Sequence, residues 1–133
     1  MIIDNIVLDQ LTRQAQKCPR LRMNFDLRNS EVDQSQRMLN AVEPGSKMPI
    51  HRHPKTSTTV IILRGRIRQN FYDDSGFQTE SVVLDANGMT RAIQIEIGRW
   101  HNLESLESGT ILFEAKNGAW EPYELFNKSH STT

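Results

Sequence analysis

Turn-forming residues interrupt this chain at short intervals, and this spacing restricts the folds that the chain can adopt. Clusters rich in proline, glycine, aspartate and serine lie at residues 44–45, 54–57, 65, 73–76, 85–88, 98 and 107–109. The intervals between them are about 8–12 residues, which suits short strands joined by tight turns. We therefore predict a mainly β protein with a closed or sandwiched antiparallel architecture.

The strands themselves are predicted from alternation and from β-branched residues. The clearest is 58–63, which is mostly threonine, valine and isoleucine. In 91–97, Ile93, Ile95 and Ile97 should share one face. The full set of predicted extended segments is 20–28, 36–43, 50–53, 58–63, 66–72, 77–84, 91–97 and 110–116.

One short N-terminal helix is predicted over residues 4–18. Asp4 or Asn5 can cap it, and Pro19 should end it. Its apolar residues at approximately helical spacing are Ile6, Val7, Leu11 and Ala15. We expect this helix to pack as a lid on the β-domain.

Length and composition point to one soluble domain. With 133 residues, we expect a single domain over 1–126 and a polar, disordered tail over 127–133. Lys plus Arg and Asp plus Glu both number 16, so no net charge favours nucleic acid or an anionic membrane. A single cysteine excludes an internal disulfide, and no signal peptide or membrane-spanning run is evident. These features predict a cytoplasmic protein.

Two histidines in an extended segment are the strongest chemical signal. His51 and His53 are two positions apart, so their side chains should leave the same strand face. Imidazoles bind transition metals and transfer protons near neutral pH, and His101 could supply a third group. The alternative is that the pair is merely polar surface on a strand edge between Pro49 and Pro54.

The spacing around these histidines resembles the first motif of the cupin superfamily, which is Gly, five residues, His-x-His, three or four residues, Glu, six residues, Gly. Gly45, His51, His53 and Gly65 keep this register, and Thr58 stands at the glutamate position. The resemblance implies a cupin-type antiparallel β-barrel, also called a double-stranded β-helix or jelly roll.

The second cupin motif, Pro-x-Gly-x-x-His with a later Asn, resembles the stretch around His101. Gly98 and His101 match it, whereas Glu96 replaces the proline and Ser105 the asparagine. Further segments look like the WbuC-type cupins, namely 20–24, 36–41, 43–45, 63–66 and 110–114. This closer resemblance implies a metal site, a homodimer and a link to bacterial surface-polysaccharide biosynthesis of the O-antigen, or lipopolysaccharide, type.

The resemblance also implies a ligand set of three histidines and one carboxylate. Here His51, His53 and His101 would hold one divalent transition metal ion, and Zn, Ni, Fe and Mn are not distinguished. Thr58 offers only a neutral hydroxyl, so we expect weak binding. Glu43 or Glu96 could replace the carboxylate, but nothing in the sequence places either one there.

Three functions remain open at this point. The first is a metalloprotein that binds or acts on a sugar-derived small molecule. The second is a metal-free keto-sugar isomerase whose histidines act as acid and base, with Tyr72 as a possible proton donor. The third is a degenerate cupin that binds a sugar without catalysis, so whether the protein is an enzyme stays open.

Four polar residues in the first two strands are candidates for ligand binding. Arg22 and Asn24 share one strand face, as do Gln36 and Asn40. If these side chains point into a barrel, they need a ligand or each other as partners. If they line the outer face, solvent satisfies them, and the sequence does not decide between the two arrangements.

Overall fold

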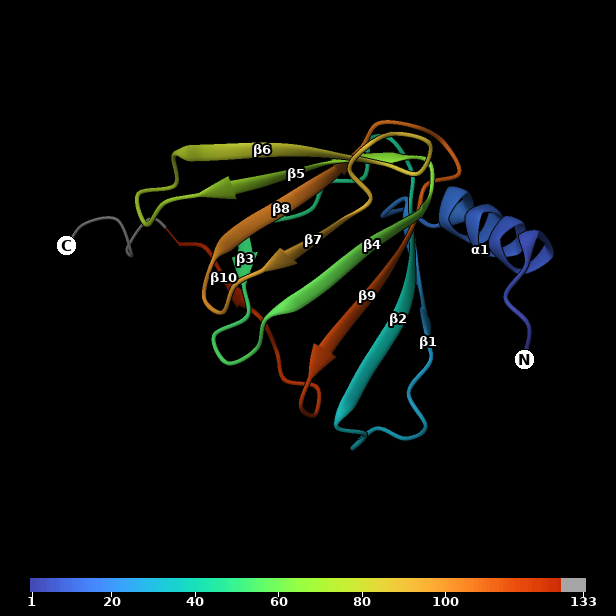
Figure 1. Ribbon diagram of the computed structural model, residues 1–133, viewed down its shortest axis with the longest axis horizontal. Coiled ribbons are helices and arrows are strands. Elements are labelled where there is room, and N and C mark those ends of the chain that lie inside the picture. Colours follow the sequence, from blue (N-terminus) through green and yellow to red (C-terminus); the bar gives the residue numbers. More distant parts are fainter. Residues whose placement is uncertain (128–133) are drawn as a thin grey trace.

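The computed structural model describes residues 1–127 and consists of two facing sheets with one helix outside them (Figure 1). The elements are α1 (Asn5–Lys17), β1 (Arg22–Asp26), β2 (Ser35–Val42), β3 (His51–Arg52), β4 (Thr58–Arg64), β5 (Arg66–Tyr72), β6 (Gln78–Asp85), β7 (Ala92–Ile95), β8 (Trp100–Ser105), β9 (Ile111–Asn117) and β10 (Glu124–Leu125). The strand orders are β1-β2-β9-β4-β7 and β10-β3-β8-β5-β6, with antiparallel pairing throughout. The predicted mainly β class with a short N-terminal helix is confirmed.

Helix α1 covers the outer side of β1 and β2. The Asp4 carboxylate caps it by accepting hydrogen bonds from the Ile6 and Val7 N–H groups at 3.1 and 3.2 Å. The predicted apolar face was partly wrong, because the Ile6 side chain is 67% exposed. The buried residues are Leu8, Leu11, Thr12 and Ala15, a spacing of three and four that forms one stripe against the sheet.

The space between the sheets is apolar at one end and polar at the other. Its apolar core comes from both sheets and comprises Val42, Val60, Ile62, Ile67, Phe71, Leu84, Ile95, Leu103 and Leu112. Val60, Ile95 and Leu103 also line a cavity of about 220 Å³. The hydrophobic core therefore forms the floor of this cavity, and its walls combine polar with apolar side chains.

Gly65 carries the chain from β4 in one sheet to β5 in the other. Its φ of 80° lies in the left-handed region that favours glycine. A Cβ atom at this position would lie 2.8 Å from the Cα of Thr110. The crossover between the sheets thus needs glycine for both conformation and space.

Two strands were missed by the sequence prediction, and two were predicted too long, since 20–28 contracts to β1 and 91–97 to β7. Strands β8 and β10 were not predicted, although β8 carries His101. The predicted strand 91–97 ends at Ile95, and Ile97 is 60% exposed instead of sharing the face of Ile95. Just beyond that end, the Gly98 N–H donates a hydrogen bond to the His53 carbonyl at 2.9 Å and ties the two motif regions together.

The predicted tail 127–133 lies outside the described residues, apart from Asn127. Within residues 1–127, no helix is long and apolar enough to cross a membrane.

Candidate metal centre

The sheet β10-β3-β8-β5-β6 brings the three predicted histidines together. His51 in β3 pairs directly with His101 in β8, and His53 follows β3 by one residue. Their ring centroids lie 4.3 to 5.8 Å apart. One nitrogen from each ring lies within 4.8 Å of the other two. These three residues, hereafter the histidine cluster, therefore could hold a metal ion.

Backbone carbonyl groups fix the orientation of two of these rings. The Nδ1 of His51 donates to the Pro49 carbonyl at 2.9 Å, and the Nδ1 of His101 donates to the Arg99 carbonyl at 2.8 Å. A carbonyl oxygen only accepts, so each Nδ1 carries the proton and each Nε2 keeps its lone pair. Metal-bound histidines commonly use this arrangement.

The histidine cluster is held in the neutral form. Burial lowers the pKa of His53 to about 3 and of His101 to about 4, and nearby positive charge, including that of Lys116, adds to the effect. Burial also lowers the pKa of His51, while its bond to Pro49 and the Glu114 carboxylate act in the opposite direction. Neutral imidazoles are the form that binds a metal cation, so the donor set fits the implied ion.

Thr58 lies on the inward face of β4, at the position where the related motif carries glutamate. Its side chain lines the cavity, is 3% exposed, and has an Oγ1 without a hydrogen-bond partner among residues 1–127. Thr59 faces the other way and donates to Gln94 Oε1 at 2.6 Å. The inward position is thus occupied by a short neutral side chain instead of a carboxylate.

The two carboxylates suggested as substitutes are used elsewhere. Glu43 accepts hydrogen bonds from Ser108 Oγ at 2.6 Å and from the Gly109 N–H at 2.7 Å. Glu96 pairs with Arg99 at 3.2 Å. Neither lines the cavity, so neither stands in for the missing ligand.

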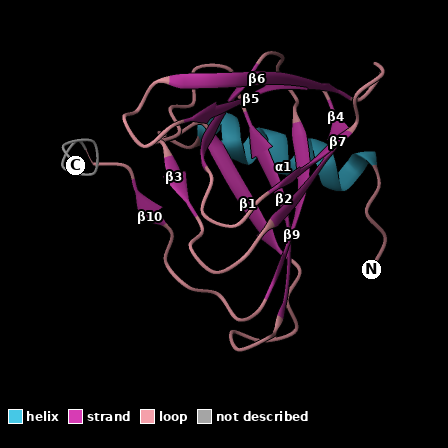
Figure 2. Ribbon diagram, turned by 60° about the vertical axis from the view of Figure 1, so that its left-hand side comes forward, coloured by secondary structure: helices cyan, strands magenta, loops and turns pink. Residues whose placement is uncertain are grey.

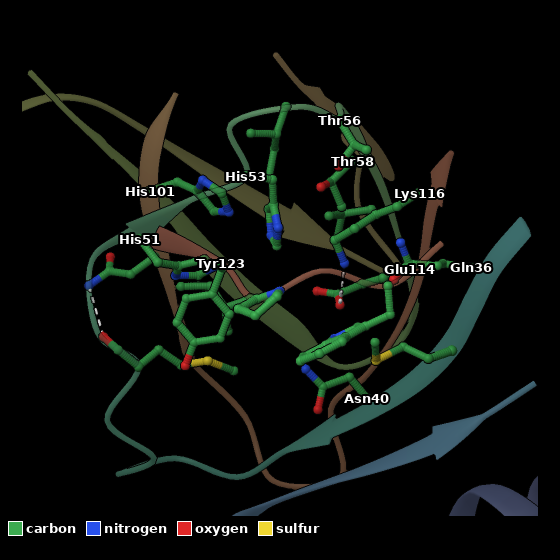
Figure 3. Close-up of a pocket in the computed structure, with 18 of the residues that line it drawn as sticks. Gln36, Asn40, His51, His53, Thr56, Thr58, His101, Glu114, Lys116 and Tyr123 are labelled. Carbon is green, nitrogen blue, oxygen red and sulfur yellow. Dashed lines mark hydrogen bonds and ion pairs between the residues drawn. The ribbon is translucent and has the colours of Figure 1, made fainter. Parts of the chain in front are cut away.

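Glu114 and Lys116 are cavity residues that the sequence analysis missed. Both come from β9, whose inward face also carries the buried Leu112, and Figure 3 shows them across the cavity from the histidines. Lys116 Nζ lies 4.0 Å from Glu114 Oε2. Glu114 is not within reach of the histidine cluster as a fourth ligand. Strand parity with Leu112 was the signal that could have revealed both residues.

The predicted polar set lies in the cavity wall. Arg22, Asn24, Gln36 and Asn40 all line it, so the inward arrangement is the correct one of the two left open. Two are anchored: Arg22 Nη1 donates to the Lys47 carbonyl and Gln36 Nε2 to the Gly118 carbonyl, each at 2.9 Å. Their role in ligand binding stays a prediction.

Tyr72 does not line the cavity. Its hydroxyl donates to Asn102 Oδ1 at 2.9 Å, and Asn102 is the residue that reaches the cavity wall. A different tyrosine stands beside the histidines. The ring of Tyr123, which precedes β10, lies 4.8 Å from that of His51 and was not predicted.

The C-terminal segment closes one side of the cavity. Strand β10 lies beside β3 at the edge of its sheet, as Figure 2 also shows. The residues just before β10 contribute to the wall, including Trp120, Pro122 and Tyr123. The histidine cluster is therefore covered by a segment far from it in the sequence.

Two facing antiparallel sheets in this order, with three histidines gathered between them, define a protein with the cupin, or double-stranded β-helix, fold. The chain belongs to the family described as "Domain of unknown function (DUF6016)", whose sequence model matches residues 3–84. No curated protein matches the chain.

Solved structures share the fold at low sequence identity. An oxalate oxidase in complex with the substrate analogue glycolate has a TM-score of 0.66 at 17% identity, covering 82% of this chain and 57% of the oxidase. The capsular polysaccharide assembling protein CapF from Staphylococcus aureus has a TM-score of 0.66 at 16% identity, covering 78% and 30%. A double-stranded β-helix protein from Klebsiella pneumoniae subsp. pneumoniae has a TM-score of 0.65 at 15% identity, covering 93% and 89%. The chain thus spans little more than half of the oxidase and most of the Klebsiella protein.

Proposed function

We propose that this protein is a small metal-binding cupin whose cavity binds, or acts on, a sugar-derived molecule. The observation that carries the proposal is the histidine cluster, in which one buried and two half-buried neutral imidazoles gather their nitrogens at the cavity wall. His51, His53 and His101 would hold one divalent transition ion. Such an ion would supply a Lewis-acidic centre with coordination positions left open toward the cavity.

Two further observations support a sugar-derived ligand. The cavity has amide, guanidinium and hydroxyl groups in its wall, and such groups recognise a polyhydroxylated molecule better than an apolar one. The WbuC-type resemblance points to surface-polysaccharide biosynthesis, and the structural neighbour CapF is described as a capsular polysaccharide assembling protein. The role in O-antigen formation and the homodimer expected from the same resemblance are part of this proposal.

The low histidine pKa values weigh against metal-free isomerisation. A histidine that shuttles protons works best with a pKa near the operating pH. His53 and His101, with pKa values of about 3 and 4, would stay neutral and give poor general acids near pH 7. The same property favours a role as metal donors.

Metal analysis tests the proposal. Protein purified without nickel affinity should contain a divalent transition metal, or bind Zn²⁺ at one site per chain in titration calorimetry. His101→Ala should lose at least tenfold in Zn²⁺ affinity, because the substitution removes one of the three nitrogen donors of the cluster.

The matched control is His130→Ala, which removes the fourth histidine of the chain, a residue for which we expect no role. Its Zn²⁺ affinity should equal that of the wild type. Equal Zn²⁺ binding by His101→Ala and the wild type would contradict the proposed metal centre.

A further inference from the structure

Lys116 places a positive charge in the protein interior. Among residues 1–127, no carboxylate lies within hydrogen-bond distance of its ammonium group. Its side chain is 9% exposed and that of Glu114 is 16% exposed. The Nζ to Oε2 distance of 4.0 Å is too long for a hydrogen bond. Within residues 1–127 no other carboxylate lies within ion-pair distance of Lys116. A largely desolvated ammonium group therefore faces the cavity with its N–H donors open.

The charged residues of the cavity wall are mostly positive. The charged residues that line the cavity are Arg20, Arg22, Lys55, Lys116, Glu114 and Glu121. Lys55 and Glu121 lie 3.4 Å apart and balance each other. Arg22 donates only to the neutral oxygens of Lys47 and Ser46. The wall therefore has an excess of positive charge, from Arg20, Arg22 and Lys116, that Glu114 alone does not balance.

The wall also has acceptors without donors. Asn40 Oδ1 and Gln69 Oε1 are buried and have no hydrogen-bond partner among the described residues, and both side chains line the cavity. An amide oxygen can only accept, so a partner from outside the chain must donate. Hydroxyl groups of a ligand are donors of this kind.

We propose that the cavity takes a hydroxylated carboxylate, such as a sugar acid, with its carboxylate accepting hydrogen bonds from Lys116 Nζ and its hydroxyls facing the amide wall. This inference rests on the proposed function, because it names the chemical class of the ligand for the same cavity. The ligand carboxylate would lie closer to Lys116 Nζ than the Glu114 carboxylate does. Neutral sugars would leave the ammonium without an anion at hydrogen-bond distance and bind more weakly.

Matched acid and neutral probes test the inference. We would measure binding of D-galacturonate against D-galactose, and of glycolate against ethylene glycol, to metal-free wild type by calorimetry at low ionic strength. The acid of at least one pair should bind at least tenfold more tightly than its neutral counterpart. Lys116→Met should abolish this preference, and Lys116→Arg should keep it, because arginine restores the positive charge.

Lys17→Met is the charge control, since Lys17 is an exposed residue at the end of α1, and it should keep the full preference for the acid. Circular dichroism and thermal unfolding would show that each variant is folded. The inference is overturned if neither acid binds better than its neutral counterpart, or if folded Lys116→Met keeps the preference. If galactose binds although the acid is not preferred, the further inference fails but the proposed sugar-binding function is supported. Zn²⁺ binding tests the metal centre independently of both.

Discussion

At the scale of single residues, Thr58 is the departure that most affects the site. Its Oγ1 is buried without a partner, and the residue is paired in register with Lys116 on β9. We predict that Thr58→Glu raises metal affinity by about tenfold or more, most for Fe²⁺ and Mn²⁺, which prefer hard oxygen donors. Titration of both ions into wild type and variant measures the change.

Thr59→Glu is the matched control for this substitution. Thr59 points away from the cavity toward Gln94, so a carboxylate there should leave metal affinity unchanged. Tighter binding by Thr59→Glu and not by Thr58→Glu would show that the inward face of β4 has been assigned wrongly.

Much of the site could be predicted at this scale, because motif spacing and strand parity locate side chains on faces. The convergence of His51, His53 and His101 followed from that logic. Glu114 and Lys116 escaped it, because a charged pair in a strand is normally solvated and nothing local shows that β9 is central in its sheet. Parity with the buried Leu112 places both side chains on the inward face, but only the pairing of β9 with both β2 and β4 shows that this face lies in the middle of a sheet.

At the scale of elements, strand β10 fixes the position of residues 119–123, which cover one side of the cavity. Arg52 in β3 makes a bidentate ion pair with Glu124 at 3.0 Å, and its guanidinium lies 4.2 Å from the ring centroid of Trp100. The Phe126 N–H donates to the Ile50 carbonyl at 2.9 Å. The segment that carries Tyr123 is thus fixed to the strand that carries His51.

We predict that Glu124→Gln loosens this cover more than it destabilises the fold. Amide hydrogen exchange over residues 119–126 should become faster, while the free energy of unfolding should fall by about 1 kcal/mol or less, because the pair is partly exposed. Glu121→Gln, at the exposed pair with Lys55, should change the exchange rates much less. Unchanged exchange over 119–126 in Glu124→Gln would contradict this role.

Elements were predictable where turn-forming residues or a polar loop flank them, as for β2, β4, β5 and β6, and β4 is also rich in β-branched residues. These four strands were found close to their true bounds. Strand β8 was missed because its buried residues include His101 and Ser105 beside Leu103, so a polar interior hides the alternation. Strand β10 has two residues, too few to leave any periodic pattern.

At the scale of the whole molecule, the lowered pKa values of the histidines make stability depend on pH. Their folded pKa values of about 3 for His53 and about 4 for His101 lie below the ordinary value of 6.5. Between these values the unfolded chain binds more protons than the folded one, so stability falls as the pH drops from about 6.5 toward 4. The loss should reach at most about 1.4 kcal/mol per pH unit for each histidine, and less for the partly exposed His53.

Urea unfolding of metal-free protein at pH 7.5, 6.0 and 5.0 measures this loss. The double variant His53→Gln/His101→Gln should show a much flatter dependence, because glutamine does not titrate. The lowered pKa values of carboxyls such as Asp26 and Asp33, which result from hydrogen bonds, affect stability at lower pH and leave this interval to the histidines. An identical pH dependence in the wild type and the double variant would contradict the assignment.

The position of β9 determines when this molecule can assemble during synthesis. β2 and β4 do not pair with each other, and each forms its ladder with β9, which spans Ile111–Asn117. A ribosome-bound chain in which β9 has not yet been synthesised therefore exposes an unpaired edge on β2, an unpaired edge on β4 and the apolar interior. The sheet can close only when the chain has emerged as far as β9, and such distant pairings make folding slow. Nascent chains should consequently need protection of those edges from other chains until β9 has emerged.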